Sequence, residues 1–174
     1  MRTIIPLVAV AALAAACRPS RNAPKDGQLS VEWQGSDRGR FAAPAIATHC
    51  PETGLVELLA VRGDSGVGLA LFPADSGKLA AAIFPIFAGS DLNESRPGAN
   101  AAIRWFAGAE LAVFEGQAGQ VRLIAAGTTL SGTIEVRMHA VSGTDTLRAT
   151  GRFDGVPVTR GGAGCGRLSR RNLI

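Results

Sequence analysis

The chain has 174 residues and a formal net charge of +4, from 18 basic and 14 acidic residues. This length suits one domain with a sizeable core, and so mild a charge, clustered on no single element, is not that of a nucleic-acid binder. The chain contains no Tyr and few other aromatic residues, which argues against a stacking platform for bases or sugars.

The first 17 residues form a segment of their own. Ile4–Ala16 is apolar apart from one proline and follows Arg2. This run is too short to span a bilayer and ends in small residues, as a cleaved export signal does. Ala14–Ala16 directly before Cys17 resembles the lipobox of bacterial lipoproteins, although Ala14 stands where that family prefers Leu.

The resemblance implies a signal peptide over residues 1–16 and a palmitate-type lipid on Cys17 that holds the chain at a membrane. Arg18, rather than Asp, follows the Cys, which favours the outer membrane, facing the periplasm, over the inner membrane. Cleavage by an ordinary signal peptidase after the same small residues is the alternative. Removing 16 of 174 residues leaves 158, with 17 basic and 14 acidic residues and a net charge of +3.

Cysteine usage then predicts one disulfide. With Cys17 lipidated, Cys50 and Cys165 remain, and export places both in a compartment where disulfides persist. We therefore expect a Cys50–Cys165 bridge with Cα atoms within about 7 Å of one another. Two buried free thiols are the alternative.

Residues 17–28 carry Pro, Lys, Asp and Gly without apolar periodicity and are typical of a flexible tether. Residues 29–165 are expected to form a single β domain, followed by a basic tail over 166–174. Alternation begins with Leu29, Val31 and Trp33. A second apolar run covers 41–49, where Pro44 predicts an edge strand or a bulge.

Glycine-rich turns divide the middle of the chain. Gly63–Gly66 separates two apolar runs, which predicts a hairpin. A four-residue loop there sets Ala60 opposite Leu69, and apolar residues on both faces predict a central hairpin. Further strands are expected at 83–87, 101–106, 110–115 and 120–126.

The clearest hairpin comes last, where residues 134–140 and 147–153 alternate strictly between apolar and polar side chains. Such strands have one dry and one solvated face. A loop of four residues over 142–145 places Glu135 opposite Arg152, whereas a two-residue loop sets Arg137 against Arg148. Since like charges opposite one another are unfavourable, the four-residue loop is predicted.

Short strands with a turn every 8–12 residues, and no convincing amphipathic helix, predict an all-β fold. We expect an antiparallel β-sandwich, with a small up-and-down or Greek-key β-barrel as the alternative.

No catalytic or metal-binding set emerges. Residues 47–50 and 63–66 resemble two segments of chymotrypsin-like proteases, but Ser65 follows His49 by only 16 residues. The chain is also too short for the two barrels on which such a triad is built. His49 and His139 are the only histidines and lack metal-ligand spacing. We therefore expect no catalytic residue, no metal and no cofactor.

The expected function is a non-enzymatic, membrane-anchored envelope module that binds another envelope protein or serves a structural role. The alternative is a carrier of small apolar ligands, with a barrel lumen that opens near 83–87. A hydrolase is a third and weaker expectation.

Overall fold

The computed structural model describes residues 27–74, 79–88, 97–162 and 165. Within this part of the chain there is no helix long and apolar enough to cross a membrane. The described residues form nine strands: β1 (Gln28–Gly35), β2 (Gly39–His49), β3 (Val56–Arg62), β4 (Ser65–Phe72), β5 (Ala82–Pro85), β6 (Gly98–Ala107), β7 (Glu110–Ala126), β8 (Thr129–Ala140) and β9 (Thr146–Arg160).

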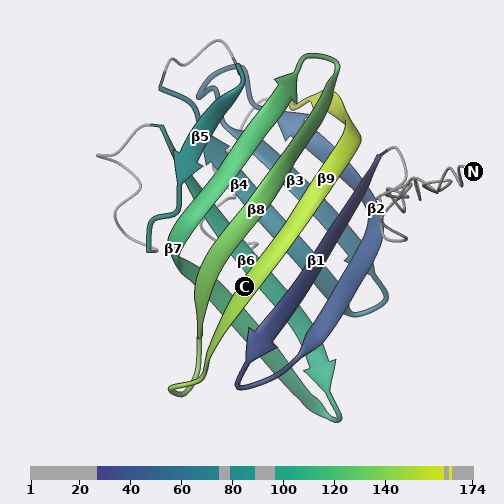
Figure 1. Cartoon of the computed structure of the whole chain (residues 1–174). Helices are drawn as coiled ribbons and strands as arrows, with labels where there is room; N and C mark the ends of the chain where they lie inside the picture. Colours follow the sequence, from purple (N-terminus) through teal and green to yellow (C-terminus); the bar gives the residue numbers. More distant parts are fainter. Residues whose placement is uncertain (1–26, 75–78, 89–96, 163–164, 166–174) are drawn as a thin grey trace, which may run out of the picture.

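Eight of these strands close into a barrel (Figure 1). The ring runs β1-β2-β3-β4-β6-β7-β8-β9 and returns from β9 to β1, with antiparallel pairing at every step. The all-β antiparallel expectation is confirmed. The sandwich is not, because β7–β8 and β1–β9 pairing joins what would be two sheets into one ring, which is the barrel alternative. Closure removes exposed sheet edges.

The ninth strand, β5, pairs with β7 where β6 leaves it. Ala82–Pro85 run antiparallel to residues 120–123 of β7, and the Ile86 N–H donates to the Gly119 carbonyl at 2.9 Å. On the other side of the ring β1 begins at Gln28, opposite Pro44 and Asp154, and beyond that point the last residues of β2 pair in parallel with β9, Ala47 opposite Val158.

The two ends of the barrel differ. The turns that join β1–β2, β3–β4, β6–β7 and β8–β9 all lie at one end, which we call the hairpin end; three of them point downward in Figure 1. The β2–β3 connection, the β7–β8 turn and the Cys50–Cys165 disulfide lie at the other, which we call the disulfide end.

Alternation within each strand fills the interior. In β1, Leu29 and Val31 are buried while Glu32 and Gln34 are exposed, as a pleated strand with one dry face requires. Each buried large aliphatic side chain contributes about 1.5–3 kcal/mol relative to an exposed one. The largest side chains with less than 2% exposure include Phe84, Phe153, Leu29, Leu58, Leu69, Leu71, Leu123, Leu130 and Met138.

The register of the β3–β4 hairpin differs from expectation. Ala60 faces Val67 rather than Leu69, because Gly63-Asp64 forms a two-residue turn between Arg62 and Ser65. Gly63 has φ +57°, the left-handed region that short hairpin turns assign to glycine. The expected burial on both faces holds for residues 66–71 of β4 but not for β3.

The last hairpin also contradicts the prediction, since Arg137 lies directly opposite Arg148 and Glu135 lies opposite Thr150. The predicted like-charge cost is offset diagonally, because Arg148 forms an ion pair with Glu135. The loop covers residues 141–144, and the Val141 N–H donates to the Val113 carbonyl of β7 at 2.9 Å.

Two further expectations change within the barrel. Residues 110–126 form one strand rather than two, because the glycines there produce a bulge between Gly116 and Ala118 instead of a turn. Pro44 does not mark an edge strand, since β2 lies inside the ring; β2–β3 pairing starts only at Ala45, so the proline interrupts no ladder bond there.

Candidate functional site

Three aromatic rings stack at the hairpin end of the barrel. Trp33 of β1 stacks on Trp105 of β6, with ring centroids 4.7 Å apart and planes inclined by 30°. Trp105 stacks in turn on Phe114 of β7, at 5.2 Å and 2°. These are the two tryptophans of the whole chain. Since β1 and β6 lie on opposite sides of the ring, the stack crosses the barrel and closes the core at this end.

A hollow of about 280 Å³ adjoins the stack, and we call it the aromatic hollow. Its wall combines aromatic and aliphatic side chains with five polar residues from three turns, and three of these five, Asp37, Glu110 and Asp145, are carboxylates. Trp105 is half-buried and Leu111 exposed, so apolar surface remains accessible there. The hollow is lined by Ser36, Asp37, Trp105, Ala107, Glu110, Leu111, Ala112, Val113, Phe114, Ala140, Ser142 and Asp145.

Close packing determines the position of Trp33. A Cβ on Gly39 would lie 2.4 Å from Cζ2 of the Trp33 ring, so only glycine fits there. The Trp33 side chain is 8% exposed, and its indole N–H has no hydrogen-bond partner within the described residues. A buried donor without a partner costs free energy, which the stacking and burial of the ring must offset.

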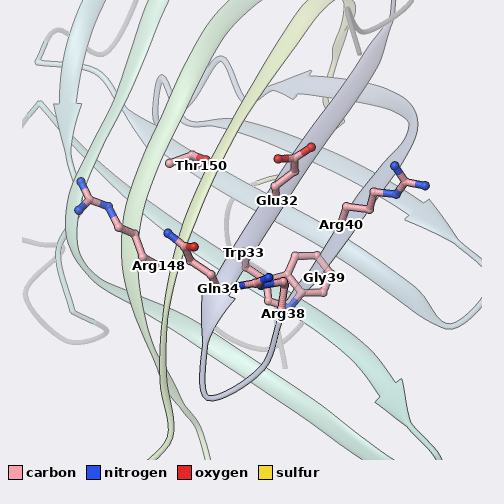
Figure 2. A pocket seen from close by; sticks show the side chains of 8 residues that line it. All are labelled: Glu32, Trp33, Gln34, Arg38, Gly39, Arg40, Arg148 and Thr150. Atoms are coloured by element: carbon pink, nitrogen blue, oxygen red, sulfur yellow. The ribbon is translucent and has the colours of Figure 1, made fainter. Parts of the chain in front are cut away.

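A second, larger hollow of about 640 Å³ lies beside the same end of β1, and we call it the arginine hollow (Figure 2). Register explains its composition: Glu32 lies between Arg40 of β2 and Thr150 of β9, and Gln34 lies opposite Arg148. It is lined by Glu32, Trp33, Gln34, Arg38, Gly39, Arg40, Arg148 and Thr150.

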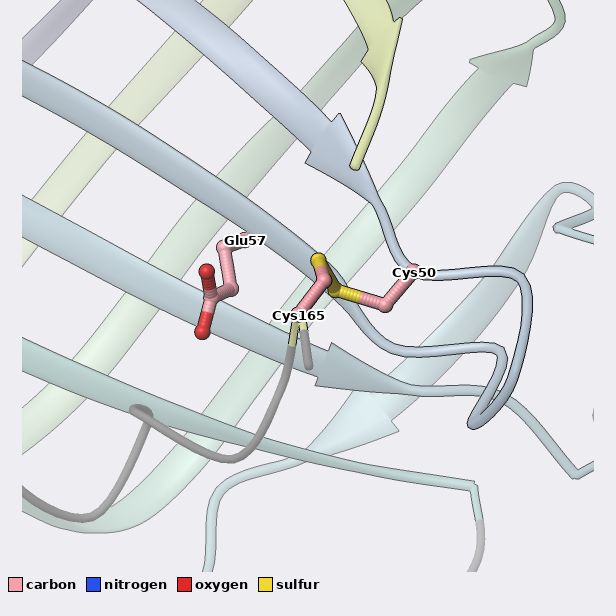
Figure 3. A group of neighbouring side chains, drawn as sticks. All are labelled: Cys50, Glu57 and Cys165. Atoms are coloured by element: carbon pink, nitrogen blue, oxygen red, sulfur yellow. A yellow bond between two sulfur atoms is a disulfide. The ribbon is translucent and has the colours of Figure 1, made fainter. Parts of the chain in front are cut away.

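The disulfide end holds the predicted bridge. Cys50 and Cys165 form a disulfide with Cα atoms 5.4 Å apart, which confirms the pairing and the distance limit. Figure 3 shows Glu57 of β3 beside it, and the ligand atoms of these three residues lie within 4.8 Å of one another. Both sulfurs are bonded to one another in the disulfide, so neither is available as a thiolate to bind a metal ion, and Glu57 is the one residue of the three that can carry a negative charge.

Burial raises the pKa of the Glu57 carboxyl above its ordinary value of 4.5. The cause is desolvation, which disfavours the charged carboxylate. The same end holds His49, whose Nε2 is buried without a hydrogen-bond partner in the described part of the chain.

The structure separates the remaining residues that the sequence analysis considered. His139 is half-buried in β8, with Nδ1 2.7 Å from the Ala140 carbonyl oxygen. Residues 63–66 belong to the β3–β4 hairpin at the end opposite His49, so they form no catalytic set. Phe84 and Ile86, near the expected lumen opening, are buried in the core. Cys17 and the tail over 166–174 lie outside the described residues.

No protein-family model, curated protein or solved structure matches this chain. The candidate site therefore rests on geometry alone.

The sequence analysis did not single out the aromatic stack or the arginine hollow. A signal for the stack existed: Trp33 and Trp105 each lie three residues before a turn, at Ser36 and Gly108. No signal of that kind marks the arginine hollow, because it depends on β1 lying between β2 and β9.

Proposed function

We propose that this protein binds a small apolar ligand in the aromatic hollow, without catalysing a reaction. The observation that carries the proposal is the stack of Trp33, Trp105 and Phe114 beside a hollow of about 280 Å³. Buried core aromatics need no adjoining hollow, whereas a binding site needs apolar wall together with access. The half-buried Trp105 and the exposed Leu111 provide both.

The proposal also covers where in the cell the protein is located. The lipobox-like segment that ends at Cys17 supports a lipoprotein anchored to the cell envelope, at the outer membrane and facing the periplasm. A lipid on Cys17 then keeps a ligand-binding barrel close to the membrane, where apolar small molecules concentrate.

The experiment measures binding of N-phenyl-1-naphthylamine, an uncharged apolar probe whose emission rises in a dry site. Saturable binding is expected for the wild type. Leu111→Glu, which replaces an exposed apolar part of the wall with a fourth carboxylate, should weaken binding about tenfold, the effect of losing roughly 1.4 kcal/mol.

Ile124→Glu is the matched control. Ile124 lies on β7, is 60% exposed, and does not line the hollow. It should bind the probe as the wild type does. Equal weakening in both variants, or no saturable binding by the wild type, would refute the proposed site.

A second candidate function is binding of another envelope protein through the outer faces of β2 and β3. Ile46 and Leu59 lie opposite one another and are 57% and 47% exposed, and Val61 is 44% exposed. Adjacent exposed aliphatic side chains are typical of interaction surfaces. A photo-crosslinker at position 46 should capture one defined partner in intact envelopes, and the same group at position 104 of β6 should not.

A further inference from the structure

Three arginines from separate segments surround the hairpin end of β1 (Figure 2). Arg40 belongs to β2, Arg148 to β9, and Arg38 to the turn between β1 and β2. All three are exposed and line the arginine hollow. The barrel topology therefore brings Arg148 of β9 to the same hollow as Arg38 and Arg40, and Figure 2 shows the side chains of Arg148 and Arg40 on opposite sides of β1 with Arg38 between them.

The charge in this hollow is only partly compensated. Glu32 is the one carboxylate among the described residues that line it, against three arginines. Arg148 forms its ion pair with Glu135 on β8, whereas within the described residues no ion pair joins Arg38 or Arg40 to a carboxylate. Arg137, directly opposite Arg148, adds a further positive charge. Like charges in such positions repel one another, and a bound anion would reduce that repulsion.

We propose that the arginine hollow binds a phosphate group, carried either by a soluble phosphate compound or by a lipid headgroup. The arginine guanidinium presents a planar fork of N–H donors that matches phosphate oxygens in bidentate geometry. Gln34 and Thr150 line the same hollow and add an amide and a hydroxyl donor. The arginines of this site are exposed on the outer face of the barrel, and no residue that lines it also lines the aromatic hollow.

The test uses the full chain in two arms. One arm measures binding of inorganic phosphate by calorimetry, and the other measures binding to phosphatidylglycerol vesicles relative to phosphatidylcholine vesicles. The difference between vesicle types is the readout, because an apolar leader or acyl chain contributes to both. In the double variant Arg38→Gln/Arg148→Gln, phosphate affinity or the vesicle difference should fall about tenfold, as expected for the loss of charge-assisted hydrogen bonds.

Two controls separate a site from net charge. Arg104→Gln removes one exposed arginine from β6, on the opposite side of the ring from β1, and should leave binding unchanged. Glu32→Gln removes the carboxylate that competes with the anion and should tighten binding. All these side chains are exposed, and circular dichroism verifies that each variant folds.

The two arms distinguish the sources of the phosphate. Binding of inorganic phosphate that the double variant loses identifies a soluble phosphate compound. A vesicle difference that the double variant loses, without binding of inorganic phosphate, identifies a headgroup. The single variant Arg38→Gln removes the same charge as Arg104→Gln and is measured beside it. The proposal is overturned if neither arm shows binding, or if Arg104→Gln weakens binding as much as Arg38→Gln does.

Discussion

The indole ring of Trp33 stacks on that of Trp105 with 4.7 Å between centroids, although their strands, β1 and β6, lie on opposite sides of the barrel. Side chains that meet across a ring close its interior. The core is therefore sealed at the hairpin end by the stack, and the aromatic hollow lies beside this seal.

Gly39→Ala should disturb the stack directly. The new Cβ would lie 2.4 Å from Cζ2 of Trp33, and overpacking of this kind costs about 1–3 kcal/mol. Thermal unfolding should show the loss, and tryptophan emission should shift. Gly127→Ala, where a Cβ meets no atom within 4 Å, is the control and should change neither.

The disulfide should contribute strongly to stability. Cys50 and Cys165 are 115 positions apart in sequence, and the chain-entropy model gives about 4–5 kcal/mol for closing so long a loop. Denaturant unfolding of Cys50→Ala/Cys165→Ala should show a loss of this order. A loss below about 1 kcal/mol would contradict the entropic argument.

Stability near Glu57 should depend on pH with a defined sign. Because burial raises its pKa in the folded state above 4.5, the folded protein holds the proton more tightly than the unfolded chain does. This stabilisation is fully present below the unfolded pKa and is lost as pH rises through the folded pKa.

Glu57→Gln should therefore be more stable than the wild type at neutral pH and should lose that advantage at low pH. Urea unfolding across this pH range measures the difference. Glu52→Gln removes an exposed carboxylate from the neighbouring loop and controls for net charge. A constant difference at all pH values would show that the amide acts through packing instead.

The diagonal ion pair in the last hairpin should be small but measurable. Glu135 and Arg148 have side chains that are 50% and 59% exposed, so solvent screens their attraction. A double-mutant cycle with Glu135→Gln and Arg148→Gln should give a coupling of about 0.2–1 kcal/mol. High salt should reduce it, and a coupling of zero at low salt would assign no energetic role to the pair.

Much of the strand pattern could be predicted, since the alternation of Leu29, Val31 and Trp33, or of the residues in β8, follows from one dry face per strand. The closure of the sheet into a barrel could not be predicted in this way, because a sandwich and a barrel require the same alternation of buried and exposed residues. It depends on pairings such as β9 with β1, which local patterns do not encode.

The hairpin registers and the arginine hollow could not be predicted from the sequence for related reasons. The sequence prediction weighs only directly opposite charges and therefore excludes the pairing of Arg137 with Arg148, whereas in the structure Arg148 forms an ion pair with the diagonal neighbour Glu135. The disulfide was predictable because the expected lipidation of Cys17 leaves two cysteines, Cys50 and Cys165. The arginine hollow could have been predicted only from the order of strands in the ring, which places β2 and β9 on either side of β1.

Lipidation of Cys17 is tested by labelled palmitate. Incorporation into the wild type and none into Cys17→Ser, with release of that variant from the membrane fraction, is the expected result. An unlabelled wild type would instead indicate cleavage by an ordinary signal peptidase after the same small residues.

Energy transfer from tryptophan to bound N-phenyl-1-naphthylamine tests the central claim most directly. The chain has two tryptophans and no tyrosine, and both tryptophans belong to the stack beside the aromatic hollow. A probe bound there should quench tryptophan emission saturably, with the same affinity as its own emission reports. Leu111→Glu should weaken both signals together. Saturable probe binding without quenching of Trp33 and Trp105 would place the ligand elsewhere and contradict the account.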